Sequence, residues 1–180
     1  MRNRTASFCY TFPMKYLLLT AITLIVSCCS PVATYPPIEV ESALTFSNAN
    51  FEPVPTILVT TIEYARDHFG GLETVVYNLP VGMGSETYDI VTSRVEGAKP
   101  LQENGQQAYH ITELRVRGFK AEANTTFPGG GGYETATLYL SKTLSGPWKV
   151  TRERVWLIPD VEVPSPNYVG TEKFEIVDPE

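Results

Sequence analysis

Four arginines are the side chains whose spacing most suggests a binding function. Arg115 and Arg117 lie two residues apart, and so do Arg152 and Arg154. Because successive strand residues point to opposite faces of a sheet, residues two apart share a face. Guanidinium groups bind carboxylates and phosphates through paired hydrogen bonds, and they stack on aromatic rings. The two pairs therefore predict an anion-binding surface if both lie on strands of one sheet.

Aromatic residues occur in phase with these arginines. Tyr133 and Tyr139 share a parity on one predicted strand, and Trp148 shares the parity of Trp156 and of the second arginine pair. One sheet face would then bind an anionic or sugar-like ligand. The candidate ligand-binding residues are Arg115, Arg117, Arg152, Arg154, Trp156 and His110. The alternative is a solvated ladder of cross-strand ion pairs, which the number of nearby acids favours. These acids are Glu113, Glu122, Glu134 and Glu153.

His110 precedes Glu113 by three residues. A histidine and a carboxylate held together can transfer protons. Residues three apart on a strand point to opposite faces unless a bulge intervenes, so this pair is a weak catalytic signal. His68 follows Asp67 at the end of a predicted helix, where its side chain would interact favourably with the helix C-terminus. We therefore predict no catalytic residues.

Composition excludes several classes of protein. The 180 residues include 14 Lys and Arg against 20 Asp and Glu, and the net charge of −6 argues against a nucleic-acid partner. Three cysteines cannot form a disulfide-rich scaffold, and two histidines leave little material for a zinc site. The run Gly129–Gly132 lacks the Lys-Ser/Thr of a phosphate-binding loop. We expect no metal and no cofactor.

The N-terminal region carries the most specific motif. Lys15 precedes an apolar run, residues 16–26, which is too short to span a bilayer and has the length of a signal-peptide core. The sequence Ile25-Val26-Ser27-Cys28 follows and resembles the lipobox of bacterial lipoproteins. The resemblance implies cleavage before Cys28, a diacylglycerol on its thiol and a membrane anchor. An ordinary secretory signal with a chance cysteine is the alternative. Translation would begin at residue 1 or at Met14.

This resemblance defines the expected compartment. Cleavage removes three of the 14 basic residues and no acidic one, which leaves 11 against 20 and a net charge of −9. The partners expected are the membrane, through the lipid anchor, and an envelope protein or glycan. Position 29 is Cys and not Asp, so the retention signal of some bacterial lipoproteins is missing. That favours the outer membrane of the cell envelope.

Composition divides the chain into four segments. We predict a signal peptide over 1–27, a lipidated Cys28 with a Pro-rich tether over 28–54, an α+β domain over 55–159 and an acidic, Pro-containing tail over 160–180. Within the domain, helices are expected over 55–69 and 86–95, and strands over 72–79, 109–127, 133–144 and 148–158. The alternation in 109–127 slips, which a bulge near Thr112 or a break at Gly118 would explain.

The order of these elements predicts an α+β two-layer sandwich, with an antiparallel sheet of about four strands and two helices on one face. The architecture is loosely similar to cystatin-like and nuclear-transport-factor-like folds. The sequence favours a non-enzymatic lipoprotein that serves as a binding or structural module. The alternative is an envelope enzyme or small-ligand carrier with a cupped sheet that uses His110, Glu113 and the arginines.

Overall fold

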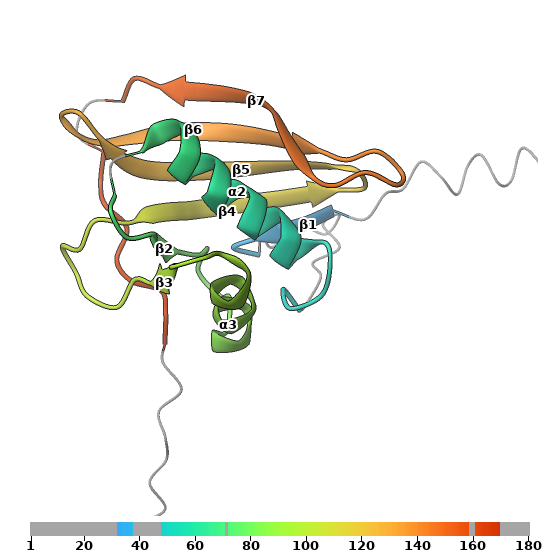
Figure 1. Cartoon of the computed structure of the whole chain (residues 1–180), viewed down its shortest axis with the longest axis horizontal. Helices are drawn as coiled ribbons and strands as arrows, with labels where there is room; N and C mark the ends of the chain where they lie inside the picture. The colour runs from blue at the N-terminus through green and yellow to red at the C-terminus, as the bar shows by residue number, and fades with distance from the viewer. Residues whose placement is uncertain (1–31, 38–47, 71, 159–160, 170–180) are drawn as a thin grey trace, which may run out of the picture. The chain divides into compact units, whose positions relative to one another are not determined.

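A mixed β-sheet of seven strands lies at the centre of the described part of the chain (Figure 1). The computed structural model describes residues 32–37, 48–70, 72–158 and 161–169. Cys28 and the predicted signal peptide lie outside these residues. The strands are β1 (Val32–Tyr35), β2 (Val76–Asn78), β3 (Lys99–Pro100), β4 (Tyr109–Arg117), β5 (Lys120–Gly129), β6 (Gly132–Ser141) and β7 (Lys149–Trp156).

The strand order is β3-β2-β4-β5-β6-β7, and β1 also pairs with β4. β4 to β7 form an antiparallel meander, whereas β2 runs parallel to both β3 and β4. β2 pairs with the first residues of β4, and β1 pairs with its last four in antiparallel register. The α+β class is confirmed, but the predicted antiparallel sheet of about four strands is wrong in size and direction. β1 and β3 are too short for alternation to reveal them.

The stretch predicted as one strand over 109–127 forms two. Gly118 has φ +56°, and the two-residue turn Gly118-Phe119 joins β4 to β5 as a hairpin. The predicted bulge is also present, because the register shifts between Ile111 and Glu113 and leaves Thr112 as an extra residue. The sequence offered the break and the bulge as alternatives, and the structure contains both.

Two helices accompany the sheet, α2 (Val54–Phe69) and α3 (Ser85–Arg94), each within one residue of its predicted bounds. Pro55 sits in the first turn of α2, where its missing N–H is harmless, and Gly70 ends the helix with φ +64°. α2 crosses one face of the sheet over β4, β5 and β7, and α3 packs beside α2 and β3 (Figure 1).

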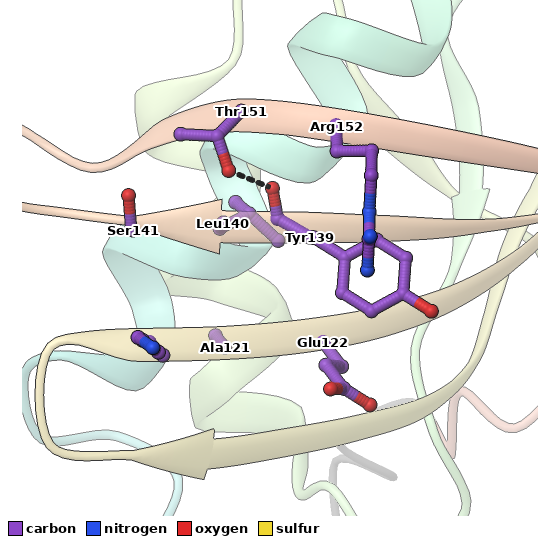
Figure 2. A pocket seen from close by; sticks show the side chains of 8 residues that line it. Ala121, Glu122, Tyr139, Leu140, Ser141, Thr151 and Arg152 are labelled. Carbon is purple, nitrogen blue, oxygen red and sulfur yellow. Dashed lines mark hydrogen bonds between the residues drawn. The ribbon is translucent and has the colours of Figure 1, made fainter.

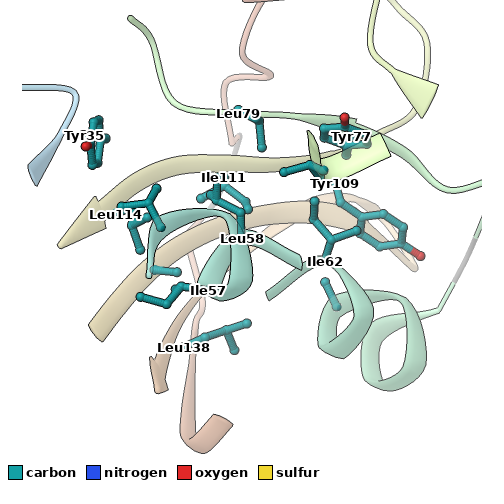
Figure 3. Packing of buried hydrophobic residues seen from close by; sticks show 14 of the residues in the cluster. Tyr35, Ile57, Leu58, Ile62, Tyr77, Leu79, Tyr109, Ile111, Leu114 and Leu138 are labelled. Carbon is teal, nitrogen blue, oxygen red and sulfur yellow. The ribbon is translucent and has the colours of Figure 1, made fainter. Parts of the chain in front are cut away.

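The core fills the space between α2 and the sheet. Ile57, Leu58 and Ile62 project from α2 toward Leu114 of β4 and Leu138 of β6, and each of these five side chains is fully buried (Figure 3). Burial of one such side chain contributes about 1.5–3 kcal/mol. This packing fixes the face of the four-strand meander that points inward, and so it fixes the opposite face as well.

The segment after β7 returns to the far edge of the sheet. The Asn78 side chain at the end of β2 donates to Ser165 O (2.8 Å) and accepts from Asn167 N (2.9 Å). Tyr168 packs edge-on against Tyr88 of α3, with ring centroids 5.0 Å apart. These contacts lie within the segment predicted as a tail, just as β1 lies within the predicted tether.

Candidate ligand-binding face

The sheet surface opposite α2 carries all six candidate binding residues. Strand register aligns four rows of side chains across β4, β5, β6 and β7. We call these sixteen residues the open face: His110, Thr126, Thr135 and Trp156; Glu113, Asn124, Thr137 and Arg154; Arg115, Glu122, Tyr139 and Arg152; and Arg117, Lys120, Ser141 and Lys149. Most of the alternate residues of the same strands belong to the core.

Two arginines of the open face place their guanidinium groups over aromatic rings. The guanidinium carbon of Arg152 lies 3.9 Å from the Tyr139 ring centroid, and that of Arg154 lies 3.8 Å from the Trp156 ring. Trp156 Nε1 donates to Thr137 Oγ1 at 3.0 Å, which fixes the indole on the sheet. A stacked guanidinium loses less side-chain freedom on binding and keeps the N–H groups at its edge for an anion.

The predicted ladder of cross-strand ion pairs does not form among the described residues, and one of the four arginines pairs with an acid of its own strand. Arg115 contacts Glu113 at 2.6 Å. Within residues 32–37, 48–70, 72–158 and 161–169, no carboxylate lies within 4.0 Å of the guanidinium nitrogens of Arg117, Arg152 or Arg154. Three of the four guanidinium groups can therefore accept an external anion without first breaking an ion pair to these residues.

Two of the four acids predicted to form this ladder lie on the other side of the sheet. Glu153 pairs with Leu138 on the core side of the sheet, where it accepts a hydrogen bond from Tyr64 of α2 at 2.9 Å. Glu134 pairs with Phe127, which is also a core residue. Strand alternation thus takes two of the four acids away from the arginines.

The open face is strongly cationic in a chain whose net charge is −6. It carries two carboxylates, those of Glu113 and Glu122. Its cationic side chains are Arg115, Arg117, Lys120, Lys149, Arg152 and Arg154. Charge of one sign concentrated on one face attracts ligands of the opposite sign.

Two shallow depressions lie on this face. One, of about 440 Å³, is lined by Glu122, Tyr139, Ser141 and Arg152, among others, and opens on the side away from the helices (Figure 2). The second, of about 340 Å³, is lined by Arg115, Arg117, Lys120, Ala121 and Glu122. Both include Lys120 and Glu122, so they meet across β5. The surface offers cations, one carboxylate and hydroxyls along a continuous path.

His110 lies on the open face by register but is buried, with 1% of its surface exposed. Its Nδ1 is 3.4 Å from the Asn78 Nδ2 donor, and its ring packs edge-on against Tyr133. Nε2 has no hydrogen-bond partner within the described ranges. Burial lowers the pKa of His110 to about 4, so the ring is neutral at pH 7. The contacts of His110 are therefore those of a residue packed inside the protein.

The suggested pairing of His110 with a carboxylate does not occur. Glu113 is held instead by Arg115 and by Asn124 Nδ2, which donates at 2.8 Å. His68, at the end of α2, places Nδ1 3.1 Å from Tyr64 O and stacks on the Tyr64 ring. Among the described residues, neither histidine forms an ion pair with a carboxylate.

One aromatic residue lies on the other face from that predicted. Trp148 was expected beside Trp156, but it is buried in the core with 6% exposed. The register shift between Tyr139 and Leu140 makes Thr151 an extra residue of β7, and this bulge reverses the alternation before Arg152. The same shift brings Lys149 onto the open face, which sequence reasoning missed. Lys120 was missed because its strand was predicted to continue through Gly118.

Comparisons of this chain with known proteins found no match. The sequence matches no protein-family model and no curated protein, and no solved structure matches the fold. Among the described residues, no helix is both long and apolar enough to cross a bilayer. Nor do these residues include a group of three or more His, Cys, Asp or Glu side chains that could hold a metal ion.

Proposed function

We propose that this protein is a non-enzymatic, lipid-anchored binding module of the bacterial cell envelope, and that its open face binds an anionic glycan. The observation that carries the binding proposal is the pair of stacked arginines. The guanidinium carbons of Arg152 and Arg154 lie 3.9 and 3.8 Å from the ring centroids of Tyr139 and Trp156, and neither group has an ion pair in the described structure. The anchor is proposed from the lipobox-like residues that end at Cys28.

An anionic glycan matches the chemistry of this surface. Its carboxylate or phosphate groups would accept the paired hydrogen bonds of Arg152 and Arg154. Its hydroxyls would donate to Glu122, which lines both depressions. A shallow and extended surface suits a polymer better than a small molecule, which binds in pockets that enclose most of its area.

The alternative of an enzyme or small-ligand carrier has weaker support. A carrier with a cupped sheet needs a cavity between the helices and the sheet, and the side chains of Ile57, Leu58 and Leu138 fill that space. A general acid or base would need a titratable group near the arginines with a pKa close to neutral. His110 is buried at the end of the open face, with its pKa far below neutral.

The binding proposal is tested with two matched oligosaccharides, oligogalacturonate and its uncharged methyl ester. We expect the unmodified chain to bind the acid form and to bind the ester at least about tenfold more weakly, measured by calorimetry. Arg152→Ala and Arg154→Ala should each reduce the affinity for the acid form about tenfold or more. Arg66→Ala is the control, because Arg66 is exposed at the end of α2 beside Asp67. Equal affinity for the two oligosaccharides would remove the proposal.

The anchor is tested separately by the mass of the N-terminal peptide from protein expressed in bacteria. We expect a peptide that begins at Cys28 and carries a diacylglycerol with a further acyl chain. An unmodified Cys28, or a peptide that begins before residue 28, would overturn the anchor and leave the glycan test unaffected. Two or more acyl chains would hold the domain firmly on a membrane.

A further inference from the structure

One end of the sheet gathers cations in a single row. The register aligns Arg117 of β4, Lys120 of β5, Ser141 of β6 and Lys149 of β7. Lys142 follows directly after β6, and its ammonium lies 5.7 Å from the Phe119 ring centroid. The row itself contains no acidic residue. We call this region the basic end.

Exposed apolar side chains project from the two turns at the same end. Phe119, in the β4–β5 turn, is 50% exposed, and Leu144, in the β6–β7 turn, is 87% exposed. Lys142 N donates to Phe119 O at 3.0 Å, which holds the two turns together. The nearby Glu52 forms an ion pair with Arg94 at 2.6 Å, so its charge is already offset. Apolar tips surrounded by lysine and arginine are typical of surfaces that contact anionic lipid.

The N-terminal chain enters the domain at the basic end. Val32, the first residue of β1, pairs with Arg117, the last residue of β4. Figure 1 shows β1 beside this part of β4. Val32 is the fourth residue after Cys28. Because a chain extends at most about 3.6 Å per residue, a lipid on Cys28 would be attached within roughly 14 Å of the basic end. The point of attachment and the cationic, apolar-tipped surface therefore coincide.

We propose that the basic end docks on the anionic phospholipid surface of the membrane that holds the anchor. Phe119 and Leu144 enter the interface between headgroups and acyl chains, while Arg117, Lys120, Lys142 and Lys149 contact lipid phosphates. The strands then stand on the membrane with the last row of the open face at the lipid, and the other three rows are directed sideways, clear of the lipid. The orientation rests on the proposed anchor at Cys28, but the docking contact is a property of the domain itself.

The test uses two tryptophan variants of the full chain, purified from bacterial membranes and returned to vesicles. Leu144→Trp places a probe at the basic end, and Leu157→Trp places one beyond the other end of β7, where Leu157 is 98% exposed. Vesicles contain brominated lipids with phosphatidylglycerol, or with phosphatidylcholine alone. We expect the fluorescence added by Leu144→Trp, relative to the unmodified chain, to be quenched in phosphatidylglycerol only. The fluorescence added by Leu157→Trp should remain unquenched.

Charge variants identify the contact. Lys120→Gln and Lys149→Gln should each reduce the ratio of docked to undocked chain about fivefold, as expected for one basic residue at an anionic surface. Lys99→Gln is the matched control, because Lys99 is exposed on β3 at the other edge of the sheet. Circular dichroism checks that each variant is folded. Equal quenching of the two tryptophan probes, or none of the probe at the basic end, would overturn the docking proposal.

Raising the salt concentration distinguishes the docking proposal from the proposal of a lipid anchor. In about 1 M salt the Debye length is about 3 Å, so docking should be lost. A lipidated chain would still sediment with the vesicles while quenching in the Leu144→Trp variant disappears. A chain that shows quenching at low salt but leaves the vesicles at high salt would support docking and contradict the anchor. Two chains could instead associate in solution, resist salt and leave the Leu144→Trp probe unquenched by lipid. That result would assign the basic end to a second copy and overturn the proposal.

Discussion

The two faces of the β4–β7 meander differ completely, although they are built from alternate residues of the same strands. The face under α2 is mostly apolar, and Leu114, Leu138 and Leu140 are at most 2% exposed there. The open face places Arg115, Arg152 and other cations in solvent. The first face contributes stability through burial, while the second has little burial to contribute and offers guanidinium groups to solvent. Stability and binding are thus separated by strand alternation.

Two bulges make this separation possible. Without the extra residue Thr112, Arg115 and Arg117 would follow Tyr109 and Ile111 onto the core side. The extra residue Thr151 likewise sets the phase of the second arginine pair against that of Trp148. Because a shift of one residue moves every side chain of a strand to the other face, each bulge is needed to assemble the arginines.

The largest effect should follow truncation of the covered face. Leu138→Ala removes a fully buried side chain at the centre of β6 and should lower the free energy of unfolding by about 2–5 kcal/mol. Leu157→Ala, at a residue 98% exposed, should change it by less than about 0.5 kcal/mol. Urea unfolding followed by circular dichroism measures both. Equal losses in the two variants would contradict the assignment of faces.

His110 belongs to the open face by register and to the interior by burial, so its titration sharpens the comparison. Burial lowers the pKa of His110 to about 4 from an ordinary value of 6.5, so the folded chain binds its proton less well than the unfolded chain. Its contribution to stability is complete above pH 6.5 and is lost as the pH falls toward 4. The loss should approach about 3 kcal/mol, since a tenfold difference in proton affinity corresponds to about 1.4 kcal/mol.

The measurement compares urea unfolding of the unmodified chain and His110→Gln between pH 7 and pH 4. The difference between the two free energies of unfolding should change over this range, because only the unmodified chain carries His110. The carboxylates titrate equally in both chains and cancel in the difference. A constant difference would mean that His110 binds its proton equally well in the folded and unfolded chains, which would contradict the lowered pKa.

The predictions from sequence succeeded where patterns were long. The stripe of Leu58, Ile62 and Ala65 predicted α2 because a sixteen-residue helix repeats its period several times. The phase slip near Thr112 predicted the first bulge, because Tyr109 and Ile111 set one parity and Leu114 and Val116 set the other. In a pattern of this length, several repeats agree on which residues face the core.

Short elements and non-local pairings were not predictable. β1 has four residues and β3 has two, and both depend on partners that are distant in sequence. The second bulge was missed because few residues precede it in β7, which placed Trp148 on the wrong face. The arginine spacing identified the candidate face, but the stacking of Arg152 on Tyr139 required the register between β6 and β7.

The smallest effect expected concerns the stacked arginines themselves. In a double-mutant cycle of Arg152→Ala and Tyr139→Leu, the coupling in the free energy of unfolding should be about 0.5–1 kcal/mol, the range of exposed cation–π pairs. Arg117→Ala, in which the arginine lies over no described aromatic ring, should be within about 0.5 kcal/mol of the unmodified chain. Urea unfolding at two salt concentrations measures these values.

The salt dependence of this coupling distinguishes stacking from hidden ion pairing. A guanidinium held by ring contact keeps most of its coupling when salt is raised, whereas a surface ion pair loses it. Coupling that disappears in high salt would mean that Arg152 is held by a carboxylate, such as that of Glu122, and is no longer available to a ligand. The open face would then be a second structural surface, and its difference from the covered face would lie in polarity alone.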